Sequence, residues 1–209
     1  MTWTPPSAGV VKINCDGSSF GHNPCGAIGF VIRDSSCNFL GALARNIGQA
    51  SSLEAEFCAF MLAIEKAKEM SIPCLWMETN SVIVVNAFYK DSDIPWKMRS
   101  KWHNCLIFCR QIGCNCTHVI REGNRAADAL AKNGQGLSMF SSQWWTSPPP
   151  FISSFLLKDS LGLPYSSISM NWFCIWFRPL LTFTFHLPLS KKRALPNINN
   201  QVIIKSWHY

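Results

Sequence analysis

Several segments of the sequence place a carboxylate or amide side chain where it could do chemistry. Asp16 follows the β-branched run at 10–13, and the next residues, 17–19, predict a turn. A carboxylate at the end of a central strand is costly unless it meets a donor or a cation, because charge is poorly solvated there. Asp16 is therefore expected either to cap its own turn or to hold a metal ion.

Further candidates lie along the chain. Glu54 and Glu56 flank the apolar stripe of a predicted helix at roughly 80° on either side, so periodicity leaves open which one faces a site. Glu78 and Asn80 share one face at the end of a predicted strand, where solvation of Glu78 is expected. Asp128 lies on a later predicted helix. Oxygen atoms of such side chains are the ligands that hard divalent cations prefer.

The elements that must position these residues follow a mixed pattern. Ser51 and Glu54 match a capping box, which predicts a helix start, and Gly134 is expected to end the last helix. The order β-β-β-α-β-α-α-β-α, with its first three strands as an antiparallel meander, indicates a mixed α/β sheet covered by helices. The strands are predicted near residues 10–16, 27–33, 38–47, 73–79 and 114–120, and the helices near 51–64, 81–89, 98–112 and 124–133.

Composition and charge narrow the class of protein. A chain of 209 residues with 48% hydrophobic and 15% charged residues can bury a sizeable core, which excludes a disordered chain. Of the net charge of +7, residues 1–145 contribute +2 and residues 146–209 contribute +5. The basic balance is thus mostly a property of the tail, and gives little support for a nucleic-acid partner in the main domain.

Ten cysteines accompany an N-terminus that lacks the basic start and apolar run of a signal peptide. We therefore expect reduced thiols and an intracellular protein, nuclear or cytoplasmic. The pairs Cys105/Cys109 and Cys114/Cys116 lack the two-residue knuckle spacing typical of zinc sites. Buried thiols fit this spacing better, and a zinc-stabilised interaction module is kept as an alternative.

The composition changes after residue 140. The tryptophans at 144–145 and the prolines at 148–150 predict a docking segment or linker. The apolar stretch 170–189 is interrupted by charge and proline at 178–179, so stable membrane insertion is not expected. The basic cluster 191–193 fits either a nuclear-import signal or solvated charge.

Four short motifs occur in a defined order along the chain. They are Asp16-Gly17-Ser18, Ala55-Glu56-Phe57, Glu78-Thr79-Asn80-Ser81 and the helix start Asn124-Arg125-Ala126-Ala127-Asp128-Ala129-Leu130-Ala131. This series resembles the ribonuclease H type 1 family, and within it the retroelement-derived ribonuclease H-like domains abundant in plants. The resemblance spans about residues 1–165.

The resemblance implies a central five-stranded mixed sheet flanked by helices, a ribonuclease H-like domain at 1–140, a docking segment at 141–165 and a tail at 166–209. It also implies hydrolysis of the RNA strand of an RNA/DNA hybrid with two Mg²⁺ or Mn²⁺ ions. Asp16 would bridge the ions, Glu56 would hold one and orient water, and Asp128 would complete the other. This correspondence favours Glu56 over Glu54.

One position departs from the family pattern: Asn80 stands where family enzymes carry Asp, and its amide supplies no negative charge. A non-catalytic nucleic-acid-binding domain is therefore a second hypothesis. The resemblance further implies a monomer with substrate contacts at Gly17, Ser18, Asn23 and Ser52. His118 is expected within a strand rather than in a mobile catalytic loop.

Overall fold

The computed structural model describes residues 2–21, 24–90 and 92–165. The chain divides into two units, Met1–Ser167 and Ile168–Tyr209, and the described residues belong to the first. The expectations for 170–189 and 191–193 lie outside the described residues. No helix in the described ranges is long and apolar enough to cross a bilayer.

The described elements follow the predicted order, with one further strand and one further helix at the end. The strands are β1 Val11–Phe20, β2 Cys25–Arg33, β3 Phe39–Gln49, β4 Leu75–Thr79, β5 Asn115–His118 and β6 Ser142–Trp145. The helices are α1 Ser52–Glu69, α2 Val82–Lys90, α3 Arg99–Gln111, α4 Arg125–Gln135 and α5 Pro150–Ser160, with 3-10 turns η1 Trp96–Met98 and η2 Arg121–Gly123.

The sheet is mixed, as predicted, in the strand order β5-β4-β1-β2-β3-β6. β1, β2 and β3 form the expected antiparallel meander, while β4 pairs in parallel with both β1 and β5. It has six strands rather than the five expected, because β6 pairs antiparallel with β3. This pairing covers the backbone groups of an edge that would otherwise be exposed.

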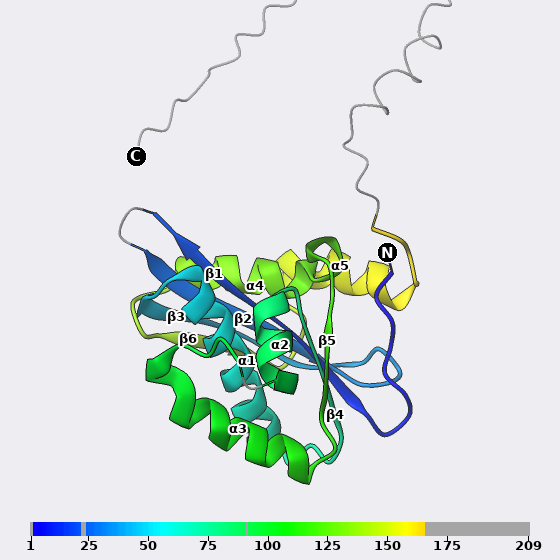
Figure 1. The fold of residues 1–209 in the computed structure, drawn as a ribbon. Coiled ribbons are helices and arrows are strands. Elements are labelled where there is room, and N and C mark those ends of the chain that lie inside the picture. The colour runs from blue at the N-terminus through cyan, green and yellow to red at the C-terminus, as the bar shows by residue number, and fades with distance from the viewer. Residues whose placement is uncertain (1, 22–23, 91, 166–209) are drawn as a thin grey trace, which may run out of the picture. The chain divides into compact units, whose positions relative to one another are not determined.

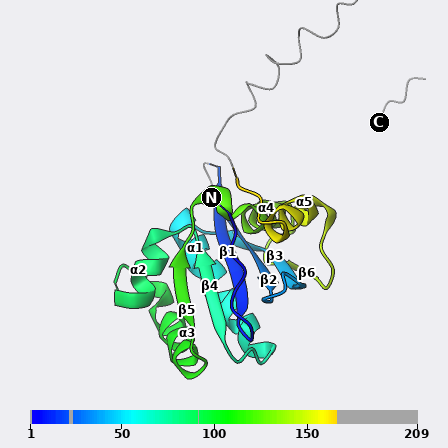
Figure 2. The same cartoon turned by 90° about the vertical axis from the view of Figure 1, so that its right-hand side faces the viewer.

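Helices cover both faces of the sheet (Figure 1). α1 packs on β1 and β2 together with α2 and α3, and α4 packs on the other face of the same strands with α5 beside it. Figure 2, turned by 90°, shows α4 and α5 together on their side of the strands. Because side chains alternate along β1, Ile13 and Cys15 enter the core under α1, whereas Asn14 and Asp16 face α4.

β1 continues past the turn that was predicted at residues 17–19, so this expectation was wrong. Gly17 is paired with Ile28 inside the β1–β2 ladder, and the strand ends at Phe20. A Cβ on Gly17 would lie 2.3 Å from backbone atoms of Ala55 and Glu56. The glycine therefore serves the close approach of α1 to the strand, and this approach places Glu56 beside Asp16.

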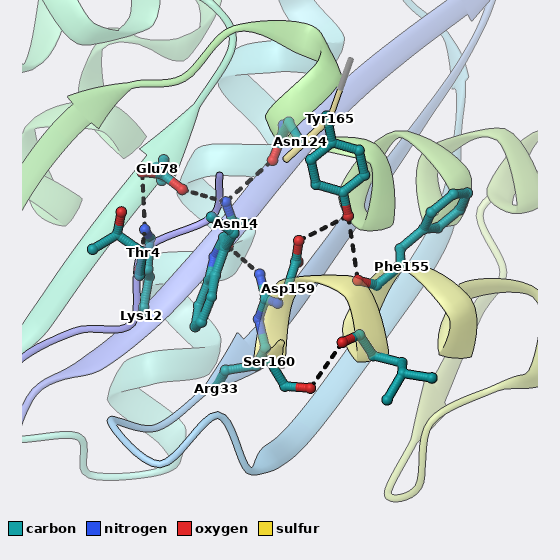
Figure 3. A network of polar contacts seen from close by, with 12 residues as sticks. Thr4, Lys12, Asn14, Arg33, Glu78, Asn124, Phe155, Asp159, Ser160 and Tyr165 are labelled. Atoms are coloured by element: carbon teal, nitrogen blue, oxygen red, sulfur yellow. Dashed lines mark hydrogen bonds and ion pairs between the residues drawn. The ribbon is translucent and has the colours of Figure 1, made fainter. Parts of the chain in front are cut away.

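A buried polar network fastens the C-terminal part of the domain to the sheet (Figure 3). Arg33 of β2 forms an ion pair of 2.6 Å with Asp159 of α5, and donates a hydrogen bond of 2.7 Å to the Asn14 Oδ1 atom. Its guanidinium also stacks 3.8 Å from the Trp3 ring, and the Tyr165 hydroxyl donates to Asp159 at 2.7 Å. The network thus joins β1, β2 and α5 through groups with little access to water.

Replacing Asp159 with alanine is expected to lower the free energy of unfolding by about 3–5 kcal/mol, because it leaves the Arg33 charge buried without its carboxylate. Urea denaturation monitored by tryptophan fluorescence measures this loss. Glu69→Ala, which breaks the exposed pair with Lys66, is the matched control and should cost about 0.5 kcal/mol or less. A loss for Asp159→Ala no larger than the control's would contradict the assigned role of the network.

Candidate active site

Two acids from different elements meet at the middle of β1. Asp16 of β1 lies close enough to Glu56 of α1 for its charge to raise the pKa of Glu56, and the Gly17 backbone N–H donates to Glu56 Oε2 at 3.2 Å. The predicted capping box is present: Ser51 and Glu54 bond each other's backbone N–H groups at the start of α1. Because Glu54 is held in this cap, Glu56 is the acid that faces β1 from the first turns of the helix.

Asp16 and Glu56 are poorly solvated, and this raises the pKa of both carboxyl groups. Asp16 is 2% exposed. Burial, followed by the nearby charge of Asp128, raises the pKa of Asp16 to about 7. Burial, followed by the charge of Asp16, raises the pKa of Glu56 to about 9. Without a cation between them, the two acids therefore retain protons near neutral pH.

This protonation predicts how stability depends on pH when a chelator is present. Both pKa values are higher in the folded than in the unfolded chain, so the folded protein binds more protons between about pH 4 and pH 9. The free energy of unfolding in EDTA should therefore fall as the pH rises from about 5 to about 9. The lowered pKa values of Asp34, Glu54 and Asp128 act below this window.

Urea denaturation at several pH values in EDTA tests this expectation. A free energy of unfolding that rises with pH throughout the window would show that Asp16 and Glu56 are not paired as described. Addition of a divalent ion should flatten the profile, because a cation offsets the repulsion that deprotonation creates.

Asp128, the third acid, is held by two cations. Its carboxylate accepts from Arg121 Nη2 at 2.9 Å and from Lys132 Nζ at 2.6 Å. Burial by itself would raise the pKa of Asp128, but the hydrogen bonds of Lys132 and Arg121 outweigh it and lower the pKa below its ordinary value. Asp128 lies close enough to Asp16 to raise its pKa, yet its oxygen atoms are drawn toward Arg121 and Lys132.

Asn80 follows β4 and is fixed by a neighbouring amide. Its Oδ1 atom accepts from Asn124 Nδ2 at 3.1 Å, and the same Nδ2 group donates to the Cys15 carbonyl at 2.9 Å. His118 ends β5, as predicted, and its Nε2 atom lies 3.2 Å from the Asn80 backbone oxygen. Residue 80 thus places a neutral side chain in a defined hydrogen-bond network.

Glu78 does not contribute to this site and is not solvated, contrary to expectation. It is 7% exposed, forms an ion pair of 3.0 Å with Lys12 and accepts from Asn14 at 2.7 Å. The Lys12 ammonium in turn lies 3.8 Å from the centroid of the Trp76 ring. These contacts hold Glu78 in the buried network of Figure 3.

The residues predicted to contact substrate differ in their hydrogen-bond partners and in their exposure. Gly17 uses its N–H on Glu56, and Ser18 Oγ accepts from Gln135 Nε2 at 3.0 Å. Ser52 is exposed at the first position of α1. Asn23 lies outside the described residues, and its contact stays a prediction.

The cysteines do not form a metal site within the described part of the chain. Its nine cysteines are free thiols. Among the residues described, no three His, Cys, Asp or Glu side chains lie close enough together to hold a metal ion as they stand. Among the acids, Asp128 forms ion pairs with Arg121 and Lys132 instead.

The fold and these motifs agree with one known family. The sequence model of the family described as reverse transcriptase-like matches residues 14–134, which is more than half of the chain. The chain belongs to this ribonuclease H-like family. The resemblance inferred from the four motifs is thereby confirmed.

Known relatives of the ribonuclease H-like chain support this membership. A curated Arabidopsis thaliana protein named "Putative ribonuclease H protein" is 31% identical over 162 residues, covering 77% of this chain and 26% of the relative. The chain thus spans about a quarter of that relative's length.

Solved structures confirm the mixed α/β fold with flanking helices. The RNase H1 of Halobacterium salinarum NRC-1 matches with a TM-score of 0.52 at 23% identity, over 61% of this chain and 98% of the other. LC11-RNase H1, solved in complex with an RNA/DNA hybrid, matches with a TM-score of 0.55 at 22% identity, over 60% and 96% of the two chains. At these identities the likeness shows the fold alone.

Three polar residues of the ribonuclease H-like site were missed by the sequence analysis: Arg121, Asn124 and Lys132. The spacing of Asp128 and Lys132, four residues apart on one helix, is the signal that could have revealed one ion pair. Arg121 begins the 3-10 turn before α4 and Asn124 is the N-cap of α4, and the sequence pattern does not indicate the direction of this turn.

Proposed function

We propose that the domain binds RNA/DNA hybrids and slowly hydrolyses the RNA strand by a divalent-metal mechanism. The observation that carries this proposal is the meeting of Asp16 and Glu56, two poorly solvated carboxyl groups with raised pKa values, beside the charge of Asp128. Deprotonation of both acids would leave unbalanced negative charge at this place. A phosphodiester is itself anionic, so its hydrolysis needs a cation at such a place.

The donor set fits Mg²⁺ or Mn²⁺, which prefer oxygen ligands. Asp16 and Glu56 would hold an ion directly, and Asp128 would complete the set once its carboxylate leaves Arg121 and Lys132. When bound, the ion supplies charge that activates water and stabilises the leaving oxygen. Asn80 offers an amide oxygen but no charge, so a two-ion site is incomplete and slow cleavage is expected.

Substrate binding is proposed at the surface around the end of β1 and the start of α1. Ser18 and the exposed Ser52 supply hydroxyl groups there, with the Gly17 backbone as a further contact. The contact expected for Asn23 rests on the sequence alone. Free N–H groups at a helix start favour phosphate, which adds to the hydroxyl contacts. We propose that the protein acts as a monomer.

A second candidate is a non-catalytic nucleic-acid-binding domain on the same fold. It is favoured by the neutral Asn80, fixed by Asn124, and by the ion pairs that occupy Asp128. Both features reduce the negative charge available to metal ions without changing the fold.

A cleavage assay on the full chain tests the proposal and separates the two candidates. The substrate is an RNA/DNA hybrid labelled on the RNA strand, incubated with Mg²⁺, Mn²⁺ or EDTA, with single-stranded RNA and RNA duplex as controls. Metal-dependent cleavage of the hybrid's RNA strand alone supports the enzyme. Binding without cleavage in either metal supports the non-catalytic domain, and absence of binding contradicts both.

A further inference from the structure

A groove beside the candidate active site runs between α4 and α5. Its volume is about 420 Å³, and its lining includes Arg121, Arg125, Asp128, Lys132 and Phe155. Residues 125, 128 and 132 lie on one face of α4 because their spacings are three and four. Asp128 therefore belongs both to the candidate site and to the wall of this α4–α5 groove.

The groove presents cations that can change partners. Arg121 and Lys132 are 68% and 60% exposed at the side chain, whereas Asp128 is only 15% exposed. Because both cations are exposed, an anion that approaches from solvent can reach them and compete with Asp128. A phosphodiester is such an anion, because Arg and Lys form charge-assisted hydrogen bonds to its oxygen atoms.

The remaining lining suits the same ligand. The Arg125 guanidinium lies 5.3 Å from the centroid of the Tyr165 ring at the base of α4. Phe155 offers an aromatic surface for a ribose or base, and its backbone oxygen accepts from the Tyr165 hydroxyl at 3.2 Å. Three cations face two acids, Glu122 and Asp128, so the groove is positive overall.

We propose that the α4–α5 groove binds a backbone phosphate of the nucleic acid, and that this phosphate takes Arg121 and Lys132 away from Asp128. The freed carboxylate then becomes available to a divalent ion beside Asp16 and Glu56. Nucleic-acid binding and metal binding therefore strengthen each other, by the same factor in both directions. The inference rests on the proposed function and deepens it: the site becomes competent for metal when substrate arrives.

Lys132→Met in the full chain tests the proposal, because its two expected effects have opposite signs. Mn²⁺ binding to the free protein, measured by calorimetry, should tighten by about 2–5-fold, since Asp128 loses a competing partner. Binding of a fluorescein-labelled RNA/DNA hybrid in EDTA should weaken several-fold, and its salt dependence should become shallower by about one unit. A lysine with a merely structural role would not move the two affinities in opposite directions.

Two variants serve as controls. Arg125→Gln removes a charge from the same groove but not from the Asp128 ion pairs, so it should weaken hybrid binding and leave Mn²⁺ affinity nearly unchanged. Lys90→Met, at an exposed position of α2, should change neither affinity. If Lys132→Met fails to fold, Arg121→Gln carries the same test, because Arg121 also pairs with Asp128.

The outcomes separate this proposal from the proposed function. Unchanged hybrid binding, or unchanged or weaker Mn²⁺ binding, in Lys132→Met and Arg121→Gln would overturn the groove proposal while wild-type cleavage still supported the enzyme. A wild-type chain that bound neither hybrid nor Mn²⁺ would overturn both. Wild-type Mn²⁺ affinity that rises on addition of hybrid, with a smaller rise in Lys132→Met, would support the coupling.

Discussion

Asn80→Asp is expected to raise the rate of metal-dependent cleavage of the RNA strand by about 10²–10³-fold, the size of effect that one added electrostatic group has on a developing charge. An aspartate oxygen can accept the existing bond from Asn124, which is 3.1 Å long, so the substitution adds charge with little change in shape. In the proposed metal site the added carboxylate would be a fourth acid, and it would strengthen the binding of a divalent ion there. Initial rates on a labelled hybrid at saturating Mn²⁺ measure the gain.

Asn80→Ala is the matched control for this prediction. It removes the amide oxygen and adds no charge, so the rate should stay at or below that of the natural chain. Equal rates for Asn80→Asp and the natural chain, with Mn²⁺ affinity also equal, would show that residue 80 does not limit catalysis.

Asp16→Asn is expected to reduce cleavage by about 10³-fold or more, measured in the Asn80→Asp background where the rate is highest. In EDTA near pH 8, the same change should raise the free energy of unfolding by about 1–3 kcal/mol, because it removes a buried carboxylate with a raised pKa. A gain in stability with a loss of activity is typical of a group that serves function at the expense of the fold.

The stability gain of Asp16→Asn should depend on pH in a defined direction. Below about pH 4 Asp16 is protonated in both the folded and the unfolded chain, so the stability gain of Asp16→Asn should vanish there. It should grow as the pH rises from about 4 to about 7, where the unfolded chain has lost this proton and the folded chain still holds it, and level off above that range. The exposed Glu69→Gln should change stability by about 0.5 kcal/mol or less and leave cleavage unchanged. A destabilised Asp16→Asn protein at pH 8, or one that still cleaves, would contradict the role assigned to Asp16.

The parts of the fold that depend on neighbours along the chain were predictable from the sequence. The β1–β2–β3 meander and the Ser51–Glu54 capping box follow from short-range patterns, and both are present. The predictions that a turn begins at Gly17 and that Gly134 ends the last helix were wrong, because each glycine is required by close packing against an element distant in the sequence. Gly17 admits α1, and Gly134 lies buried within α4, where a Cβ would be 2.9 Å from the Arg45 carbonyl of β3.

Of the candidate site, the sequence predicted which acidic residues take part but not the contacts that they make. Periodicity could not choose between Glu54 and Glu56, because both flank the buried stripe of α1, and the choice needed the family resemblance. The buried ion pair of Arg33 with Asp159 joins residues 126 positions apart, and Lys12 pairs with Glu78 across the sheet. Such pairings depend on tertiary geometry, so the sequence pattern alone could not reveal them.

The most direct test of the central claim is anomalous diffraction from a crystal of the chain grown with an RNA/DNA hybrid and Mn²⁺. We expect a manganese peak in contact with the carboxylates of Asp16 and Glu56, joined by that of Asp128, with the Asp128 carboxylate no longer bonded to Arg121 and Lys132. A complex in which hybrid is bound but manganese is absent from these three residues, or lies elsewhere, would contradict the claim that they form a divalent-metal site.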